Sequence, residues 1–184
     1  MNQHRTLRSL ILAALLGALT AIGAWLQIPV GITSITLQFL FTAFAGVLLG
    51  WKWGAVSQLL YVAIGLLGLP VFTQGGGIGY VLQPSFGFLL GLIPAAAVIG
   101  ALTARRTGYL TVLAAVLVGD LILYAVGVPY MYLILHVYMQ SAKTFPALLA
   151  AMLVYVPGDT LKIVVVTALV PVLRRTLAKA VPNL

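Results

Sequence analysis

The sequence has no cysteine and no glutamate, and its only carboxylate side chains are Asp120 and Asp159. The absence of cysteine excludes disulfide bonds and thiol chemistry. His4 and His136 stand far apart without an HxxxH spacing, which argues against a metal site. The two carboxylates are also too widely separated in the sequence to indicate a general acid–base pair. We therefore expect no catalytic residue, no metal and no cofactor.

Charge of either sign is scarce as well. Charged residues make up 7% of the chain and hydrophobic residues 62%. A soluble domain carries about 25% charged residues, so this chain cannot cover a water-exposed surface. Its apolar runs are long and continuous rather than alternating, which predicts helices that cross a bilayer. The expected fold is all-α: a polytopic membrane protein whose residues 1–184 form a single six-helix domain.

The apolar runs place the predicted helices as follows. The six transmembrane helices are expected at residues 7–26, 36–50, 55–69, 85–103, 109–126 and 159–174. The last apolar stretch is too long for one span, and Pro157 and Gly158 divide it. A short helix should therefore end near residue 156, and the last span should begin at Asp159. The tyrosine-rich segment 127–140 is expected to form a separate helix at the membrane interface.

The basic residues indicate the orientation. An even number of spans places both termini on one side. If that side is the cytoplasm, the inner loops and ends hold eight of the ten Lys and Arg residues, namely Arg5, Arg8, Lys52, Arg105, Arg106, Arg174, Arg175 and Lys179. Lys143 falls outside and Lys162 lies within a span. This bias predicts cytoplasmic N- and C-termini in a multi-pass membrane protein, and it accounts for the net charge of +8 without nucleic acid as a partner.

The first predicted span carries small residues at helical spacing. Ala13, Gly17 and Ala21 form one stripe, and Ala14 and Ala18 form a second. Such stripes let another helix backbone approach closely. They indicate either packing within the bundle or docking of a partner protein. The segment also resembles a signal peptide, but its apolar run continues past the candidate cleavage site, so we interpret it as a span.

The connection between the third and fourth spans, residues 68–84, is rich in glycine and carries no charge. A loop exposed to bulk water would normally be more polar, so Phe72 and Tyr80 predict chain that lies back over the bundle. Glycine there allows the backbone to approach a ligand closely. The alternative is a mobile surface connector. The segment does not match a phosphate-binding loop, because no Lys-Ser/Thr follows it.

Asp159 and Lys162 lie three positions apart inside the last apolar stretch. Charges there are costly to desolvate unless they are paired or bind a ligand. The spacing puts both side chains on one helix face, with Asp159 near the positive helix end. The pair indicates either a structural ion pair or a small-molecule site that suits an amide- or urea-like group, or a carboxylate on Lys162 alone. For Asp120 we favour a hydrogen bond to a neighbouring helix over a proton or cation role.

Five stretches carry a family resemblance when they are taken together. They are residues 35–38 (ITLQ), residues 65–72 (GLLGLPVF), the glycine-rich segment up to Tyr80, residues 84–88 (PSFGF) and residues 157–162 (PGDTLK). The chain resembles the BioY family, the biotin-specific substrate-binding (S) components of energy-coupling factor (ECF) transporters. The resemblance covers nearly the full length. It implies a six-helix membrane fold with a buried biotin site at the outer side, covered by the loop between spans three and four.

The resemblance also implies the residues of the site. The biotin-binding residues would be Asp159, Lys162, Gly79, Tyr80, Phe72 and Gln38. Asp159 would accept hydrogen bonds from the ureido N–H groups, and Lys162 would donate to the ureido carbonyl or to the valerate. The family usually has Thr-Gly-Gly-Tyr where this chain has residues 85–88 (SFGF), so we expect Phe86 to reshape the pocket wall.

Partners follow from the same resemblance. It implies a transmembrane coupling protein and two ATPases, with surrounding membrane lipid as a further contact. The coupling protein would dock on Ala14, Gly17, Ala18 and Ala21 of the first span. Biotin would be a ligand rather than a cofactor.

Three alternatives remain at this point. One is an S component for another vitamin. A membrane-embedded enzyme acting on a lipid would need paired carboxylates, a metal cluster or a nucleophile with its base, which fit this sequence poorly. A small channel or proton-coupled carrier finds no support in an internal inverted repeat or a ring of charges.

Overall fold

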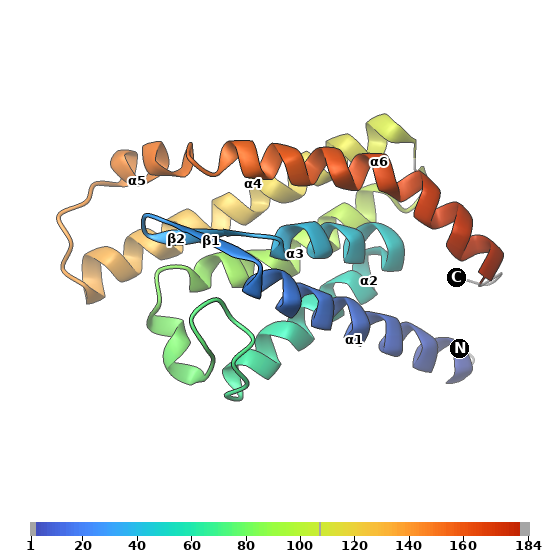
Figure 1. Ribbon diagram of the computed structural model, residues 1–184, viewed down its shortest axis with the longest axis horizontal. Helices are drawn as coiled ribbons and strands as arrows, with labels where there is room; N and C mark the ends of the chain where they lie inside the picture. The colour runs from blue at the N-terminus through green and yellow to red at the C-terminus, as the bar shows by residue number, and fades with distance from the viewer. Residues whose placement is uncertain (1–2, 107, 181–184) are drawn as a thin grey trace.

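Long apolar runs fold into helices in the computed structural model, which describes residues 3–106 and 108–180. The helices are α1 (Gln3–Trp25), α2 (Gln38–Leu66), α3 (Phe86–Leu102), α4 (Tyr109–Leu133), α5 (Phe145–Met152) and α6 (Val156–Ala180). The long helices form a bundle, and the start of α1 and the end of α6 lie at the same end of it (Figure 1). The prediction of a mostly helical fold is confirmed.

Helix α2 consists of two arms. Gly50 has φ 78° and ψ 178°, a conformation that glycine adopts without steric cost. The Thr42 hydroxyl donates to the side-chain oxygen of Gln58 at 2.9 Å although 16 positions separate them. One continuous helix would place these residues about 24 Å apart. The chain therefore turns back at Gly50, and residues 38–49 lie beside residues 51–66, as the predicted second and third spans require.

Several of these helices have the length and composition of membrane spans. In the described part of the chain, four segments qualify: Thr6–Trp25, Gln38–Leu66, Tyr109–Tyr138 and Val156–Arg174. Helix α3 is apolar but shorter. Helix α1 packs on α2, α2 on α3, α3 on α4, and α6 contacts both α2 and α4. Because α2 contains two arms, the described residues form six long helical arms around one core.

Helix α4 is longer than predicted. The span expected at residues 109–126 continues as α-helix through Pro129 to Leu133 and then as one π-helical segment, η2 (Ile134–Tyr138). The prediction of a separate interfacial helix at residues 127–140 is therefore wrong. Membrane helices tolerate proline because neighbouring groups and local π-helical adjustments satisfy the freed backbone.

Helix α6 begins earlier than predicted. The chain turns at residues 153–155, and Pro157 and Gly158 lie inside the first turn of α6. A proline is well tolerated there because its missing N–H would have no helical partner. Asp159 is in the first turn, as predicted, and its backbone N–H donates to the Tyr155 carbonyl at 3.0 Å.

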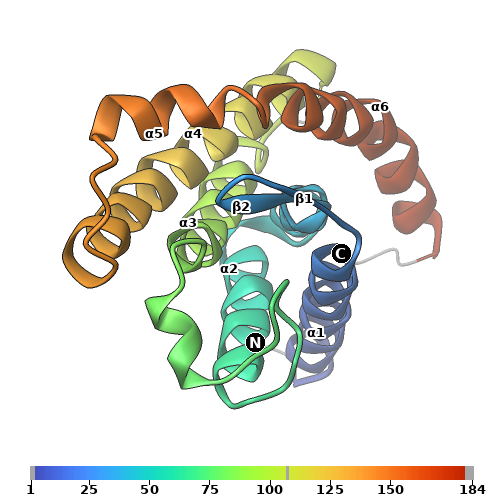
Figure 2. The same ribbon diagram turned by 60° about the vertical axis from the view of Figure 1, so that its left-hand side comes forward.

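A two-stranded antiparallel hairpin, β1 (Gln27–Val30) and β2 (Thr33–Thr36), follows α1. The sequence predicted no strands here, because residues 27–35 only separated the first two expected spans. Its alternating Ile, Val and Thr residues favour strands. Figure 2 shows the hairpin across the end of the bundle, between α1 and α2 on one side and α4 to α6 on the other. The Tyr155 hydroxyl donates to the carbonyl oxygens of Val30 and Thr33, which ties the hairpin to the start of α6.

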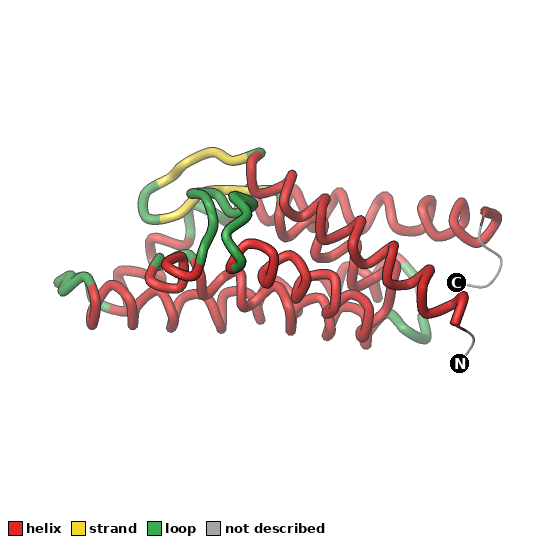
Figure 3. Tube along the Cα trace, turned by 90° about the horizontal axis from the view of Figure 1, so that it is seen from below, coloured by secondary structure: helices red, strands yellow, loops and turns green. Residues whose placement is uncertain are grey.

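The glycine-rich loop lies over the same end of the bundle, as predicted. It contains one short 3₁₀ helix, η1 (Ile78–Leu82). Figure 3 shows the loop, in green, next to the yellow strands. Phe72 is 1% exposed and fits against Gly65, where a Cβ atom would lie 2.1 Å from its ring. The loop is therefore packed into the core rather than lying free on the surface.

Candidate ligand-binding site

A cavity opens where the hairpin, the glycine-rich loop and the start of α6 meet. It holds about 650 Å³ of empty space, part of which is open to the surroundings. Its wall combines aliphatic and aromatic side chains with hydroxyls, one amide and one ion pair. It is lined by Thr33, Ser34, Ile35, Thr36, Gln38, Phe39, Thr73, Tyr80, Ser85, Phe88, Leu89, Leu92, Leu123, Tyr124, Met152, Tyr155, Asp159 and Lys162.

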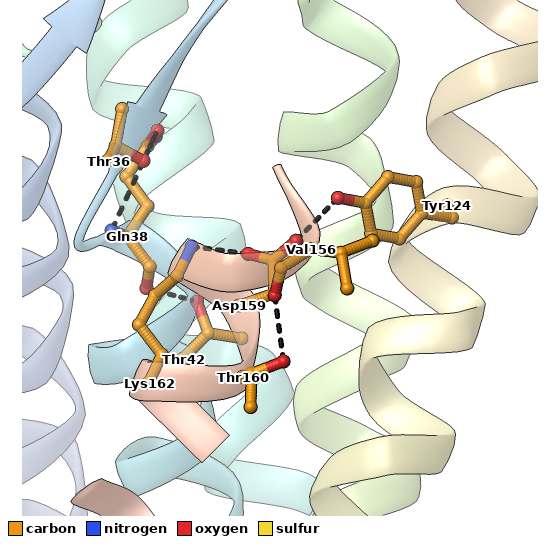
Figure 4. Close-up of polar contacts among 8 residues, drawn as sticks. All are labelled: Thr36, Gln38, Thr42, Tyr124, Val156, Asp159, Thr160 and Lys162. Atoms are coloured by element: carbon orange, nitrogen blue, oxygen red, sulfur yellow. Dashed lines mark hydrogen bonds and ion pairs between the residues drawn. The ribbon is translucent and has the colours of Figure 1, made fainter. Parts of the chain in front are cut away.

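Asp159 and Lys162 form an ion pair in this wall (Figure 4). The Lys162 Nζ lies 2.5 Å from Asp159 Oδ1, and each side chain is only 9% exposed. From α4, the Tyr124 hydroxyl donates to Asp159 Oδ2 at 2.5 Å. Both carboxylate oxygens therefore have a donor, which offsets the cost of removing the charge from water. The predicted sharing of one helix face by Asp159 and Lys162 is confirmed.

Gln38 begins α2 and lines another part of the wall. Its Oε1 accepts from the Thr36 hydroxyl at 2.9 Å, and its Nε2 donates to the Tyr61 hydroxyl at 2.8 Å. Tyr61 in turn donates to the Val71 carbonyl in the loop at 3.2 Å. These hydrogen bonds fix both the oxygen and the nitrogen of the Gln38 amide, so the amide in the cavity wall is held in one orientation.

The loop contributes the hydroxyls of Thr73 and Tyr80 to the cavity, and Ser85, just before α3, adds a third. Thr73 and Tyr80 are hydrogen-bonded at 2.8 Å, and the Tyr80 hydroxyl lies 3.5 Å from that of Ser85. Side chains from other elements hold the loop backbone in place. These bonds are Trp25 to the Pro70 carbonyl at 3.1 Å, Gln27 to the Thr73 carbonyl at 2.9 Å and Tyr130 to the Val81 carbonyl at 2.6 Å. The loop covers the cavity in a defined conformation.

Most of the predicted biotin-binding residues lie at this cavity. Four of them line it: Asp159, Lys162, Tyr80 and Gln38. The Phe72 side chain points from the loop into the core, with its ring centroid 5.5 Å from that of Tyr61 and 4.5 Å from that of Tyr80. Gly79 is on the exposed side of η1 and is not part of the lining. A contact of any of these six residues with the ligand stays a prediction.

Nothing in the sequence singled out Tyr124 and Tyr155, which both line the cavity. Burial raises the pKa of the Tyr155 hydroxyl, so it remains a neutral donor to the hairpin. The expected effect of Phe86 on the wall is not seen. Phe86 is buried between Tyr80 and Tyr130, with ring centroids 6.4 Å and 5.8 Å away, and Phe88 lines the cavity instead.

Asp120 lies one turn before Tyr124 on α4 and is outside the cavity lining. Its Oδ1 atom is buried and, among the described residues, has no hydrogen-bond partner. The hydrogen bond that we expected from a neighbouring helix is therefore missing for this oxygen. No group of three or more potential metal ligands occurs in the described part of the chain.

A second hollow, which we name the α1/α2 groove, runs between the first two helices and holds about 800 Å³ of empty space. It is lined by Ala14, Gly17, Ala18, Ala21, Ile22, Leu60, Tyr61, Ile64, Leu69 and Val71. The stripes differ in role. Ala13 is fully buried, and a Cβ atom on Gly17 would lie 2.9 Å from the Ser57 carbonyl. That stripe packs on α2, whereas Ala14 and Ala18 are exposed.

Comparison with known proteins shows the family of this chain. The sequence model of the BioY family matches residues 1–179. The chain belongs to the BioY family. A probable biotin transporter BioY of Lysinibacillus sphaericus is 49% identical over 147 residues, which cover 79% of this chain and 74% of that protein. The biotin transporter BioY of Thermotoga maritima is 35% identical over 160 residues, covering 86% and 91%.

A solved structure shows the same arrangement. The crystal structure of the S-component for biotin from an ECF-type ABC transporter matches with a TM-score of 0.83 and 29% sequence identity, covering 95% of both chains. The fold is therefore that of an ECF S component. The BioY resemblance that rested on five short stretches is confirmed over residues 1–179.

Proposed function

We propose that this protein is the biotin-binding S component of an ECF-type uptake transporter. One observation carries the proposal: a buried Asp159–Lys162 pair faces a covered cavity in a chain of the BioY family. The named relatives are transporters rather than enzymes, which agrees with the expectation that the chain has no catalytic residue. Membership of this family also weighs against the channel alternative.

The cavity offers what a vitamin with one polar ring and one apolar chain requires. Each oxygen of Asp159 has one protein donor and retains a lone pair for a ureido N–H. Lys162 uses one of its three donors on Asp159, so it can donate to the ureido carbonyl or to the valerate. Phe88, Leu89 and Leu92 supply apolar wall, and burial of apolar ligand surface contributes about 25 cal/mol per Å².

We further propose that all six helical arms cross the membrane, with both termini in the cytoplasm. The start of α1 and the end of α6 lie together at the end of the bundle opposite the hairpin and loop (Figure 1). The distribution of Lys and Arg favours the same orientation. The cavity then opens on the outer side of the plasma membrane, where a vitamin would be captured for import.

The energy for import would come from partners, a transmembrane coupling protein and two ATPases, because the sequence carries no nucleotide-binding motif. The α1/α2 groove supports this part of the proposal. Its exposed Ala14 and Ala18 allow a helix backbone to approach closely within the membrane. Surrounding lipid would cover the remaining apolar faces.

The function is tested by titration calorimetry of the detergent-purified protein against biotin and a panel of other water-soluble vitamins, such as thiamine and riboflavin. We expect biotin to bind most tightly and to be found by mass spectrometry in protein purified from biotin-containing medium. Tighter binding of another vitamin would establish the alternative S component. Absence of binding to any member of the panel would overturn the assignment.

A further inference from the structure

Tyr124 of α4 contacts two neighbouring helices, α3 and α6, at the cavity. Its hydroxyl, on α4, donates to Asp159 Oδ2, on α6, at 2.5 Å. Its ring packs edge-on against Phe88 of α3, with the centroids 5.9 Å apart and an interplanar angle of 87°. All three side chains line the cavity. Tyr124 is therefore held by one neighbouring helix while its hydroxyl reaches the other.

The effect on Asp159 follows from carboxylate geometry. A carboxylate rotates about a single bond, and one donor on one oxygen leaves that rotation only partly restricted. Here Lys162 occupies Oδ1 from the same helix and Tyr124 occupies Oδ2 from a different one. Two donors on opposite oxygens fix the plane of the group. Fixing a binding group before the ligand arrives lowers the entropy lost on binding.

We propose that Tyr124 is a positioning residue, which orients Asp159 so that the carboxylate accepts hydrogen bonds from two N–H groups of the ligand. This inference rests on the proposed function, because biotin supplies those groups in its ureido ring. Tyr124 acts through Asp159 in this scheme. Its hydroxyl is already used as a donor and need not touch the ligand.

A double-mutant cycle separates this role from simple packing. Tyr124→Phe keeps the ring on Phe88 and removes only the hydroxyl. We expect it to weaken biotin binding about tenfold in the native background, because hydrogen bonds to charged groups are among the stronger ones. In an Asp159→Asn background the same change should cost no more than about twofold, because the charged acceptor is gone and the hydrogen bond weakens.

The controls distinguish the possible outcomes. Tyr132→Phe removes a hydroxyl from the same helix at a ring outside the cavity lining and should leave the dissociation constant unchanged. If Tyr124→Phe binds biotin as tightly as the native protein, or costs the same factor in both backgrounds, the positioning role is wrong and Tyr124 serves packing or direct contact. If the native protein itself does not bind biotin, the proposed function fails instead.

Discussion

The ligand cavity and the α1/α2 groove differ in the chemistry of their walls. The cavity at the hairpin end of the bundle is lined by an ion pair, an amide and several hydroxyls, and the protein itself already bonds most of these groups. The α1/α2 groove is lined by aliphatic residues and glycine, with the Tyr61 hydroxyl as the only side-chain polar group in its lining. A polar wall selects a ligand by direction, because each buried donor or acceptor needs a matched partner. An aliphatic wall made of small residues selects only by shape and close approach.

The positions of the few charged residues agree with this difference. Both members of the buried ion pair face the cavity, although only two carboxylates exist in the whole sequence. Ala14 and Ala18, which would be unremarkable in any apolar helix, are exposed residues of the groove lining. The comparison predicts that changes in the cavity alter biotin affinity, whereas changes in the groove alter uptake and leave affinity intact.

The largest effect is expected from Asp159. Asp159→Ala leaves the Lys162 ammonium buried without its partner, which costs about 3–5 kcal/mol when a buried pair is broken. We expect biotin affinity to fall at least about tenfold, which is about 1.4 kcal/mol, and Lys162→Ala to act in the same direction. Titration calorimetry in detergent measures both. Lys143→Ala, an exposed cation outside the cavity lining, is the matched control and should bind normally.

A second variant keeps this prediction informative if the single changes unfold the protein. Asp159→Leu combined with Lys162→Met removes both charges at similar volume, and replacing a whole buried pair is often neutral for stability. The folded double variant should still bind biotin at least about tenfold more weakly. If this variant binds biotin with native affinity, the Asp159–Lys162 pair has a structural role only. The polar character of the cavity would then not explain biotin binding.

The pair and its partners also show how far the sequence could predict this site. Asp159 and Lys162 are three positions apart in a helix, and helical geometry alone puts them on one face. Tyr124 is 35 positions from Asp159, and its contact depends on how α4 packs against α6. The residues of the hairpin favour strands locally, but its attachment to the start of α6 depends on Tyr155, 125 positions from Val30. Spacing along one helix is local, whereas these contacts exist only after the helices have packed.

The helix boundaries were likewise predictable only where the signal was local. The reversal at Gly50 was predictable, because glycine and interfacial tryptophans mark the turn locally. Pro157 was interpreted as a break and the fifth span was expected to end before Pro129, yet Pro129 lies within α4 and Pro157 in the first turn of α6. Their effect depends on whether neighbouring groups satisfy the backbone or the missing N–H would be unpaired anyway. Neither condition can be read from the local sequence.

The next largest effect is expected in the groove. Ala18→Trp places an indole on the exposed stripe and fills the space that a partner helix would need. Uptake of labelled biotin by cells that contain the partner proteins should fall about tenfold, while the affinity of the purified variant changes by less than about twofold. Leu15→Trp, on the same helix and exposed but outside the groove lining, should transport normally. Unchanged uptake by Ala18→Trp at equal membrane levels would exclude the groove as the docking surface.

The smallest effect is expected where the two hollows meet. Tyr61 lines the groove, but its hydroxyl accepts from Gln38 of the cavity and donates to Val71 of the loop. Tyr61→Phe keeps the groove wall apolar and leaves the buried Gln38 Nε2 without this acceptor, so we expect biotin affinity to fall about threefold, within the range of one neutral hydrogen bond. Tyr109→Phe, an exposed tyrosine at the start of α4, is the matched control.

Because Tyr61→Phe adds no bulk to the groove, its effect on uptake at saturating biotin tests the division between the hollows. Unchanged uptake at saturation, with the loss confined to affinity, would keep the cavity and the groove as separate determinants of binding and docking. A loss of uptake at saturating biotin would mean that the Gln38–Tyr61–Val71 hydrogen bonds also shape the groove. The polar wall of the cavity and the aliphatic wall of the groove would then still differ in chemistry. That difference would no longer assign ligand binding to the cavity alone and docking to the groove alone.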